Sequence, residues 1–339
     1  MQGFVLKAYG GPECTALTEV PSPVPSSRQM LVRVCAAGLN PVDFKTRRGD
    51  LRPVQGYRLP TVLGNELAGE VVAHGVQVSR FRVGDRVFAR VAKKMMGAFA
   101  QYALVDEDHA AAIPENLDFV TAAAVPLAGL TALQALRDEL GVQSGQRIFI
   151  SGGAGGVGCL AIQIAKHFGA HVATTASPRG EALVRRLGAD AVVDYTRERP
   201  ETILTGFDGA LDLVGGDALK QAMAIVKPGA RVVSVAGIPE PQTASKDLGR
   251  GLGLQALFWV ASFSLRRCAH RYGVRYRYLF MHPSGKDLAK LAGLIDAGKL
   301  EVIVDSVYPF ERIAEAMSLL EAGHAKGKIV VAMPSCPAR

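Results

Sequence analysis

The sequence has few cysteines, and they show no pairing pattern. The five cysteines stand at positions 14, 35, 159, 268 and 336, and none belongs to a C-x-x-C pair. An odd number at such wide spacing indicates neither a zinc ribbon nor a disulfide framework. We therefore expect these cysteines to be small, reduced packing residues.

Long apolar runs are also absent, and the N-terminus has no basic segment that would begin a secretory leader. The longest apolar stretch, residues 252–265, has 14 residues and is interrupted by Gln255, Ser262 and Ser264. As a helix it would be about 21 Å long, too short for a bilayer core of about 30 Å. We therefore expect a soluble, cytoplasmic protein without stable membrane insertion.

Acidic residues are missing from one segment, residues 248–286. The chain has 39 Lys and Arg against 31 Asp and Glu, a net charge of +8. Seven basic residues lie in this one segment, and the rest of the chain is nearly neutral, which is not typical of a nucleic-acid-binding protein. We expect no nucleic-acid partner. The seven are Arg250, Arg266, Arg267, Arg271, Arg275, Arg277 and Lys286.

The composition otherwise favours a folded chain of about two domains. With 339 residues, 49% apolar and 21% charged, disorder is excluded. The first 120 or so residues contain short apolar runs, such as 31–36, 70–73 and 86–89, separated by glycine and proline. Many short strands with turn signals predict an irregular β-barrel.

From Thr121 the pattern changes to alternating strands and helices. This alternation predicts a doubly wound parallel sheet, with strands at 147–150, 171–174, 191–193, 207–214, 231–235 and 276–281. A last helix, 311–322, and a last strand, 328–332, are expected to return to the first domain. The predicted domains are therefore 1–121 with 283–339, and 122–282.

A glycine-rich motif follows the first strand of the second domain. It fits G-x-G-x-x-G, directly after a strand and at the start of a helix, and this context favours dinucleotide binding over a plain turn. The glycines allow a tight turn, a close approach of the backbone to a pyrophosphate, and close packing of helix and sheet. Its members are Gly153, Ala154, Gly155, Gly156, Val157 and Gly158.

The region after the second strand indicates which dinucleotide is bound. An NAD site places an acidic residue there for the ribose 2′-hydroxyl, but residues 174–179 contain none and the first acid is Glu181. Ser177 and Arg179 can bind the 2′-phosphate of NADPH, and Tyr195 can add a hydroxyl. The alternative for Arg179 is an ordinary solvated residue at a helix start. We predict NADPH.

Six collinear motifs cover nearly the whole chain. With them the sequence resembles the medium-chain dehydrogenase/reductase superfamily, specifically its zinc-independent quinone oxidoreductase branch. Residues 40–45, Asn-Pro-Val-Asp-Phe-Lys, are most similar to the enone oxidoreductase subgroup. The motifs are 36–43, 60–69, 83–87, 97–102, 123–132 and 153–158.

This resemblance implies an α/β fold with a GroES-like β-barrel domain, a Rossmann domain and an active site between them, often in a homodimer. Relatives with catalytic zinc place Cys where this chain has Leu39 or Asn40, and His where it has Asn65. Only Glu66 remains, and one carboxylate cannot hold tetrahedral zinc. We therefore expect no metal and a buried, structural Glu66.

The resemblance also implies roles for individual residues. Asn40 and Asp43 would lie near the nicotinamide and substrate. From the chemistry of the reaction we expect Asn40 to orient the nicotinamide or to donate to the developing oxyanion, and Lys45 to be a second donor if its side chain turns inward. A turn that merely holds the loop is the alternative for residues 40–43. Contacts to the cofactor are expected from Thr131, from Val214 and Gly215, from Ala236, Gly237 and Ile238, and from Phe280 or Met281.

The favoured function is an NADPH-dependent reductase of a small-molecule quinone or α,β-unsaturated carbonyl compound. Without a metal, a conjugated acceptor is favoured because the incoming charge spreads to a distant oxygen that hydrogen bonds can stabilise. One alternative is an enoyl-thioester reductase whose basic segment 250–277 binds substrate phosphates. Another is a low-turnover NADPH-binding redox sensor or RNA-binding module, in which Tyr272, Tyr276 and Tyr278 stack bases.

Residues 252–277 allow two further interpretations. An apolar stretch followed by basic residues is one pattern of a membrane-surface helix. We favour instead a helix that lines the substrate site or a subunit contact, with Phe258 and Trp259 facing inward.

Overall fold

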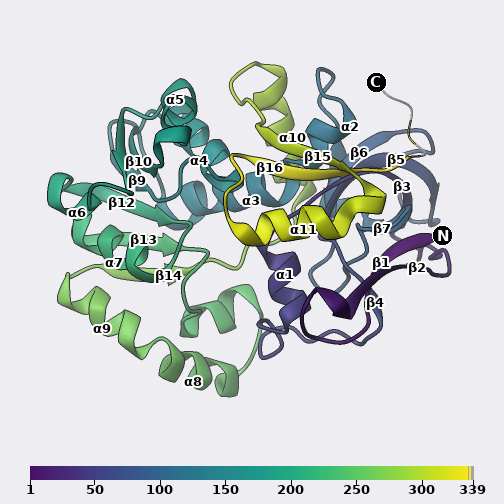
Figure 1. Ribbon diagram of the computed structural model, residues 1–339, viewed down its shortest axis with the longest axis horizontal. Helices are drawn as coiled ribbons and strands as arrows, with labels where there is room; N and C mark the ends of the chain where they lie inside the picture. Colours follow the sequence, from purple (N-terminus) through teal and green to yellow (C-terminus); the bar gives the residue numbers. More distant parts are fainter. Residues whose placement is uncertain (335, 337–339) are drawn as a thin grey trace. The chain divides into compact units, whose positions relative to one another are not determined.

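The computed structural model describes residues 1–334 and 336, which form two compact units (Figure 1). Unit 1 consists of Met1–Leu130, Pro283–Gly298 and the chain from Val302 onwards. Unit 2 consists of Thr131–His282 and Lys299–Glu301. Both termini thus belong to unit 1, and unit 2 is formed mainly by one continuous segment.

Unit 1 is built on two β-sheets. The strands alternate buried and exposed residues where one face is covered; in β3, for example, Met30, Val32 and Val34 are buried. The smaller sheet has the order β2-β1-β4, and the larger has β15-β16-β3-β5-β6-β8, with β7 also paired to β3. The strands are β1 (Gln2–Leu6), β2 (Thr15–Glu19), β3 (Gln29–Gly38), β4 (Thr61–Val62), β5 (Glu66–His74), β6 (Arg86–Arg90), β7 (Tyr102–Asp106), β8 (Ala110–Ala112), β15 (Val304–Pro309) and β16 (Lys328–Ala332).

The helices of unit 1 contact the larger sheet or one another. Helix α1 (Pro41–Arg48) begins with proline in its first turn, and the Asp43 carboxylate accepts a hydrogen bond of 2.7 Å from the Asn40 N–H. The others are α2 (Phe119–Ala123), α10 (Gly285–Asp296) and α11 (Ile313–Ala322). Helix α3 (Pro126–Gln134) crosses from unit 1 into unit 2 and continues as a π-helix over Ala135–Leu140. Short 3₁₀ turns lie at Pro12–Cys14, Glu107–His109 and Phe310–Arg312.

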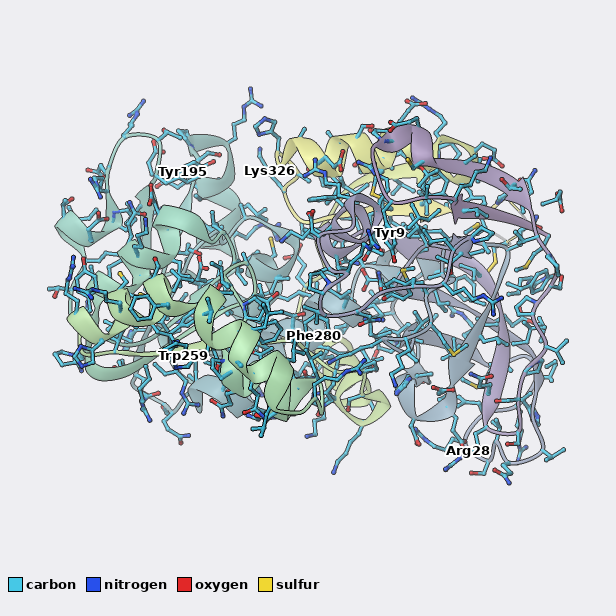
Figure 2. The ribbon with its side chains drawn as sticks, turned by 90° about the horizontal axis from the view of Figure 1, so that it is seen from below. Tyr9, Arg28, Tyr195, Trp259, Phe280 and Lys326 are labelled. Carbon is cyan, nitrogen blue, oxygen red and sulfur yellow. A yellow bond between two sulfur atoms is a disulfide. The ribbon has the colours of Figure 1, made fainter. Side chains whose placement is uncertain are left out.

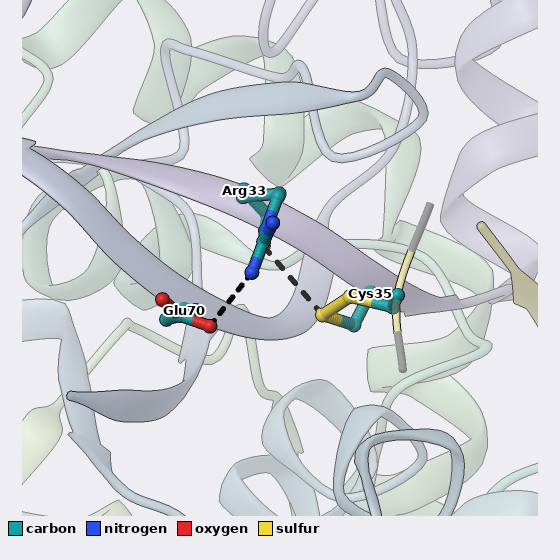
Figure 3. Close-up of a disulfide and its surroundings, with 4 residues drawn as sticks. Arg33, Cys35 and Glu70 are labelled. Atoms are coloured by element: carbon teal, nitrogen blue, oxygen red, sulfur yellow. Dashed lines mark hydrogen bonds and ion pairs between the residues drawn. A yellow bond between two sulfur atoms is a disulfide. The ribbon is translucent and has the colours of Figure 1, made fainter. Parts of the chain in front are cut away.

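The last strand, β16, belongs to unit 1 and lies antiparallel to β3. Val330 pairs with Gly38, and the Leu39 N–H donates to the Ile329 carbonyl. The same pairing brings Cys336 to Cys35, and the two form a disulfide across 301 residues of sequence, shown in Figure 3 beside the Arg33–Glu70 ion pair. The prediction of reduced packing residues is therefore wrong for these two cysteines, because strand pairing, which sequence spacing does not reveal, brings them together.

Unit 2 is a parallel six-stranded sheet in the order β11-β10-β9-β12-β13-β14. Numbered within this unit, the order is 3-2-1-4-5-6, the doubly wound arrangement that the strand–helix alternation predicts. The strands are β9 (Arg147–Ile150), β10 (His171–Ala176), β11 (Ala191–Asp194), β12 (Phe207–Asp212), β13 (Val226–Ser234) and β14 (Arg275–Tyr278). The helices are α4 (Gly156–His167), α5 (Pro178–Arg186), α6 (Pro200–Ile203), α7 (Gly216–Ile225), α8 (Leu252–Ala261) and α9 (Phe263–Arg271), with a π-helical turn at Thr243–Asp247.

The apolar stretch 252–265 does not form one helix. It breaks at Ser262, whose hydroxyl donates to the Phe258 carbonyl at 2.6 Å. Phe258 faces inward as predicted, with 4% exposure, but the prediction for Trp259 is wrong, since it is 52% exposed. The residues that pack inward are 258, 262, 265 and 269, at helical spacing, and Trp259 lies about 100° away from that row. No helix in the described part of the chain is long and apolar enough to cross a membrane.

Candidate functional site

The glycine-rich loop connects β9 to the N-terminus of α4. A Cβ atom at Gly153 would lie 2.2 Å from the Thr174 hydroxyl oxygen, and one at Gly158 would lie 2.3 Å from the Gly152 carbonyl oxygen. Side chains at these positions are therefore excluded by the sheet and by the loop itself. At Gly155 the nearest atom to such a Cβ is 3.4 Å away, so the backbone there is open to a ligand. The first N–H groups of α4, from Gly156 onwards, point out of the helix end toward this opening.

A buried carboxylate, Asp212, holds together the ends of three strands in unit 2. It accepts hydrogen bonds from the Ser151 hydroxyl at 2.8 Å, after β9, and from the Ser234 hydroxyl at 2.7 Å, in β13. It also accepts from the backbone N–H groups of Val214 (3.2 Å) and Gly215 (3.0 Å). With these partners the carboxylate fixes the loop after β12.

Ser234 extends this network to the loop after β13. Its hydroxyl oxygen accepts from the N–H groups of Ala236 at 3.1 Å and Gly237 at 2.8 Å, and the Tyr276 hydroxyl donates to the Ile238 carbonyl at 2.7 Å. Both loops that the resemblance places beside a nicotinamide are thus anchored by side chains that sequence reasoning missed. In the sequence, the only sign of these anchoring side chains is a polar residue at the end of each apolar strand, shortly before a glycine.

The region after β10 presents the residues predicted to select the dinucleotide. Ser177 occupies the N-cap position of α5 without a side-chain capping hydrogen bond, and Arg179 is exposed in the first turn of this helix. Tyr195 follows β11 and is exposed. Gly180, the residue after Arg179, is buried, and a Cβ there would lie 2.9 Å from the Ala154 Cβ of the glycine loop. The close packing of α5 on this loop therefore requires glycine and leaves Arg179 as the cation in this turn.

An acidic residue that sequence reasoning missed, Asp194, lies near the end of β10. Asp194, the last residue of β11, pairs with Ala176 at the end of β10. Its carboxylate accepts hydrogen bonds from the N–H (3.0 Å) and hydroxyl (2.7 Å) of Thr196 and lies 3.5 Å from Arg197. The Thr196 hydroxyl is the main cause that lowers the pKa of Asp194. Asp194 is thus occupied locally in holding the turn before Arg197.

The segment after β14 is tied to α3 within unit 2. The Gln134 side chain exchanges two hydrogen bonds with the His282 backbone, at 2.8 and 3.0 Å. Phe280 and Met281 precede His282 and are partly buried, and the Phe280 N–H donates to Asp247 at 3.0 Å. They lie two and three residues beyond the end of β14 rather than within the strand. Thr131 lies one turn before Gln134 in α3 and is buried.

Unit 1 contains a second group of buried polar residues, which we call the Glu66–Lys328 cluster: Asn40, Asp43, Asn65, Glu66 and Lys328. The Lys328 ammonium donates to Glu66 Oε1 at 2.6 Å, to Asn40 Oδ1 at 2.6 Å and to the Leu39 carbonyl at 2.7 Å. Asn40 Nδ2 donates to the same Glu66 oxygen at 2.6 Å. The cluster joins the end of β3, the start of β5 and the start of β16.

Asp43 and Asn65 complete the cluster. Asn65 Nδ2 donates to Asp43 at 2.6 Å, and burial raises the pKa of Asp43 to about 6. The Arg90 guanidinium donates to the Asn65 carbonyl at 3.3 Å, and burial lowers the pKa of Arg90. Asn40 is 2% exposed and Asp43 is 0% exposed, whereas Lys45, two residues further along α1, is partly exposed.

The donor set of this cluster does not fit a zinc ion. Glu66 Oε1 is bound by an ammonium and an amide, and Oε2 accepts from the Leu127 N–H at 2.6 Å. Both Asp43 oxygens accept N–H donors as well. Among residues 1–334 and 336, no group of three or more His, Cys, Asp or Glu side chains is arranged to hold a metal. Glu66 is buried, as predicted, and its charge is balanced by Lys328, which the sequence analysis did not identify.

One cation of the basic segment is not on the surface. Arg277 is buried and bound by three acidic side chains: Glu240 at 3.0 Å, Asp247 at 2.5 Å and Glu139 at 3.2 Å. Burial is the largest single effect on Arg277 and lowers its pKa. The hydrogen bonds and ion pairs with Asp247 and Glu139 together outweigh burial, so the pKa of Arg277 is raised. The RNA-binding alternative requires an exposed arginine-rich surface, and Arg277 does not belong to one.

Two protein families match the chain. The alcohol dehydrogenase GroES-like domain family matches residues 26–115, and the zinc-binding dehydrogenase family matches residues 187–331. The chain is 36% identical to an NADPH-dependent alkenal/one oxidoreductase of Arabidopsis thaliana chloroplasts, over 98% of this chain and 79% of that protein. It is also 36% identical to a mitochondrial NAD(P)H oxidoreductase of Danio rerio, over 90% of this chain and 84% of that protein.

A solved structure is similar over almost the same length. The quinone oxidoreductase of Coxiella burnetii is 32% identical, with a TM-score of 0.84 over 98% of this chain and 99% of that chain. The parallel sheet order of unit 2, the GroES-like match in unit 1 and these relatives agree with one another. The chain therefore belongs to the quinone and enone oxidoreductase branch of the medium-chain dehydrogenase/reductase superfamily.

Proposed function

We propose that the protein is an NADPH-dependent reductase that transfers a hydride to a quinone or to an α,β-unsaturated carbonyl compound. The observation that carries this proposal is the glycine loop at the N-terminus of α4, whose backbone is open at Gly155 and closed at Gly153 and Gly158. Identity of 36% with an alkenal/one oxidoreductase over 98% of the chain supports the acceptor class.

The residues of unit 2 fit NADPH. The N–H groups at the start of α4 would bind the pyrophosphate, together with the loop from Gly153 to Gly158. Ser177, Arg179 and Tyr195 would bind the 2′-phosphate, because Arg179 supplies a charge-assisted contact. Thr131, Phe280, Met281 and the two loops anchored by Asp212 and Ser234 would orient the nicotinamide. When bound, NADPH supplies the hydride.

The residues of unit 1 would assist the acceptor. We propose that Lys45, which is partly exposed, donates a hydrogen bond to the oxygen that becomes negative as the hydride arrives. Asn40 and Asp43 act as positioning residues, because both functional atoms of the Asn40 amide and both Asp43 oxygens are bound within the Glu66–Lys328 cluster. Lys45→Met should lower kcat without changing thermal stability, whereas Asn40→Ala should lower stability as well.

We propose that the reaction needs no zinc, because the buried carboxylates of Asp43 and Glu66, near the start of α1, already bind an ammonium and N–H donors. A conjugated acceptor does not require a Lewis acid. Elemental analysis of the purified protein should find less than one zinc per chain, and activity should persist in chelator. One zinc per chain together with activity lost in chelator would contradict this part of the proposal.

The test of the function is NADPH oxidation with four matched acceptors: a quinone, an enone, an enoyl-CoA and a saturated ketone. We expect turnover with the quinone or the enone, and none with the saturated ketone. Turnover confined to the enoyl-CoA would favour the enoyl-thioester reductase instead. Absence of turnover with all four, from protein that binds NADPH, would contradict the proposal.

We also propose a cytoplasmic location and a homodimer joined edge to edge through the parallel sheet, where β14 is an outer strand. Sedimentation equilibrium tests the dimer, and fractionation of the source cells tests the location. The Arabidopsis and Danio relatives are chloroplastic and mitochondrial, so the fractionation should include organelles where the cell has them.

A further inference from the structure

Helices α8 and α9 form a surface that the proposed reaction does not use. Leu252, Leu257, Trp259, Val260 and Phe263 are large apolar residues, and each is at least half exposed. Figure 2 shows Trp259 on this segment. We call these five residues, with the neighbouring cations Arg250, Arg266, Arg267 and Arg271 and with His270, the α8–α9 surface.

The exposed apolar residues do not hold these helices to the core. That contact is made by Phe258, Leu265 and Ala269, which are buried at helical spacing around the buried Ser262. Soluble proteins seldom leave contiguous large apolar side chains exposed without a binding role. In α8, apolar residues occur on nearly every side, and only Phe258 is buried among them.

Cations flank this apolar helix. Phe263, Arg266, Arg267, His270 and Arg271 line an open groove of about 500 Å³ along α9. The Arg266 guanidinium stacks over the Trp259 ring at 4.9 Å and donates to the Trp259 carbonyl at 2.8 Å. An aromatic ring and a guanidinium are thus held together where α8 meets α9.

Acidic side chains do not neutralise this surface. Residues 248–286 contain none, and the acids on adjacent elements are already paired. Glu139, Glu240 and Asp247 surround the buried Arg277. On the neighbouring α7, Asp217 pairs with Lys220 at 2.8 Å.

We propose that the α8–α9 surface binds an anionic phospholipid bilayer. Apolar side chains with a tryptophan, flanked by arginines, are what a helix lying in the membrane interface requires. At 10 residues α8 is about 15 Å long, so it would lie in the interface without spanning the bilayer. RNA would be bound by positive charge and by exposed aromatic rings alone. The exposed leucine and valine side chains of this surface would have no partner on RNA. The proposal does not depend on the reductase activity.

Trp259 is the only tryptophan in the chain, so its fluorescence reports on this surface alone. The full chain is mixed with vesicles of phosphatidylcholine that contain 30 mol% phosphatidylserine, and with vesicles of phosphatidylcholine only. With the anionic vesicles we expect co-sedimentation and a blue shift of the emission. Binding should fall at least tenfold when the salt concentration is raised from 0.1 M to 0.5 M, because salt screens the arginines.

Two variants separate the charged and apolar contributions. Arg267→Gln with Arg271→Gln leaves the Arg266–Trp259 contact in place and should weaken vesicle binding about 30-fold, at roughly fivefold per arginine. The matched control, Arg28→Gln with Arg82→Gln, removes two exposed arginines from unit 1 and should weaken binding less than threefold. Leu257→Ser with Val260→Ser should abolish the blue shift while circular dichroism stays unchanged.

Other occupants of the surface give different results, and each would overturn the proposal. If a second copy of the chain covers it, Trp259 will be shielded from iodide in lipid-free protein and exposed again on dilution. If RNA is the ligand, an oligonucleotide will bind in a salt-dependent manner while anionic vesicles leave the emission unchanged. Equal binding to both kinds of vesicle, or to neither, would also contradict it.

Discussion

Replacement of Lys328 by methionine should destabilise unit 1 strongly at neutral pH. The Lys328 ammonium and the Glu66 carboxylate are 2.6 Å apart, and their side chains are 5% and 0% exposed. Methionine keeps the length of the side chain but removes the charge and the three hydrogen bonds to Glu66, Asn40 and Leu39. An unpaired carboxylate then remains buried.

The size of this effect follows from the burial of the pair. Removal of one partner of a buried ion pair typically costs about 3–5 kcal/mol, since the remaining charge has lost its solvent and its partner. For a unit of this size that corresponds to a melting temperature lower by about 10 °C or more. Lys326→Met, two residues earlier and partly exposed, is the matched control and should shift the melting temperature by less than 2 °C.

The pH dependence distinguishes this cause from a general packing defect. In Lys328→Met the buried Glu66 carboxylate has no cation beside it, so its negative charge is unfavourable in the folded protein. The variant should therefore lose more stability at neutral pH, where this charge is present, than in acid. Thermal melts at pH 5 and pH 8 should therefore show a smaller loss at pH 5.

Two results would refute this reasoning. The first is a loss of less than about 1 kcal/mol at pH 8, which would mean that the pair is not buried as the structure has it. The second is an equal loss at both pH values. Adding Glu66→Gln to Lys328→Met removes the carboxyl and should abolish the pH dependence of the difference from wild type.

Three further predictions concern other residues. Arg179→Ala should weaken NADPH binding about tenfold or more and leave NADH binding nearly unchanged, as measured by fluorescence titration; equal affinities of the wild type for both cofactors would contradict the role of Arg179. Burial raises the pKa of Asp43 from 3.8 to about 6, so the contribution of Asp43 to stability should fall by about 3 kcal/mol as the pH rises from about 4 to about 7. The difference in stability between the wild type and Asp43→Asn, measured by chemical unfolding, should change by that amount over this range; parallel pH slopes of the two proteins would be evidence against it. Asp212→Ala should raise the Kd for NADPH at least tenfold because both loops lose their anchor, whereas Asp208→Ala, at a partly exposed pair with Lys227, should not; unchanged binding in Asp212→Ala would refute the anchoring role.

Local sequence patterns predict much of the fold. The alternation of apolar strands and amphipathic helices after Thr121 predicts the parallel sheet, and the strand at 147–150 matches β9. The glycine motif is also readable, because its spacing reflects backbone contacts within a few residues of each other.

Contacts between distant polar residues are not readable in the same way. Lys328 and Glu66 are 262 positions apart, and Asp212 and Ser151 are 61 apart, so no local pattern links them. The disulfide between Cys35 and Cys336 depends on the pairing of β16 with β3, as does the position of Lys328 beside Leu39. These side chains acquire their roles only when the sheets form.

The arginine-rich segment shows the same limit. In the sequence Arg277 is one cation among seven, but in the structure three acids from outside its strand surround it. Trp259 is the reverse case. Arg277 is a charged residue that is buried, whereas Trp259 lies in an apolar run, is expected inside, and is exposed. Composition gives the amount of charge and apolar surface, but the rotation of α8 decides which residues reach solvent.

Transfer of deuterium from NADPH to the product distinguishes direct hydride transfer from every other route. NADPH carrying deuterium at C4, on either face of the ring, is incubated with the protein and a simple enone in ordinary water, and the product is analysed by mass spectrometry and NMR. If the protein is a direct hydride-transfer reductase, the saturated ketone will carry one deuterium at its β-carbon when one of the two labelled faces is used. If turnover occurs but the β-carbon carries only solvent hydrogen with both labels, or if NADPH is never consumed, the account is contradicted.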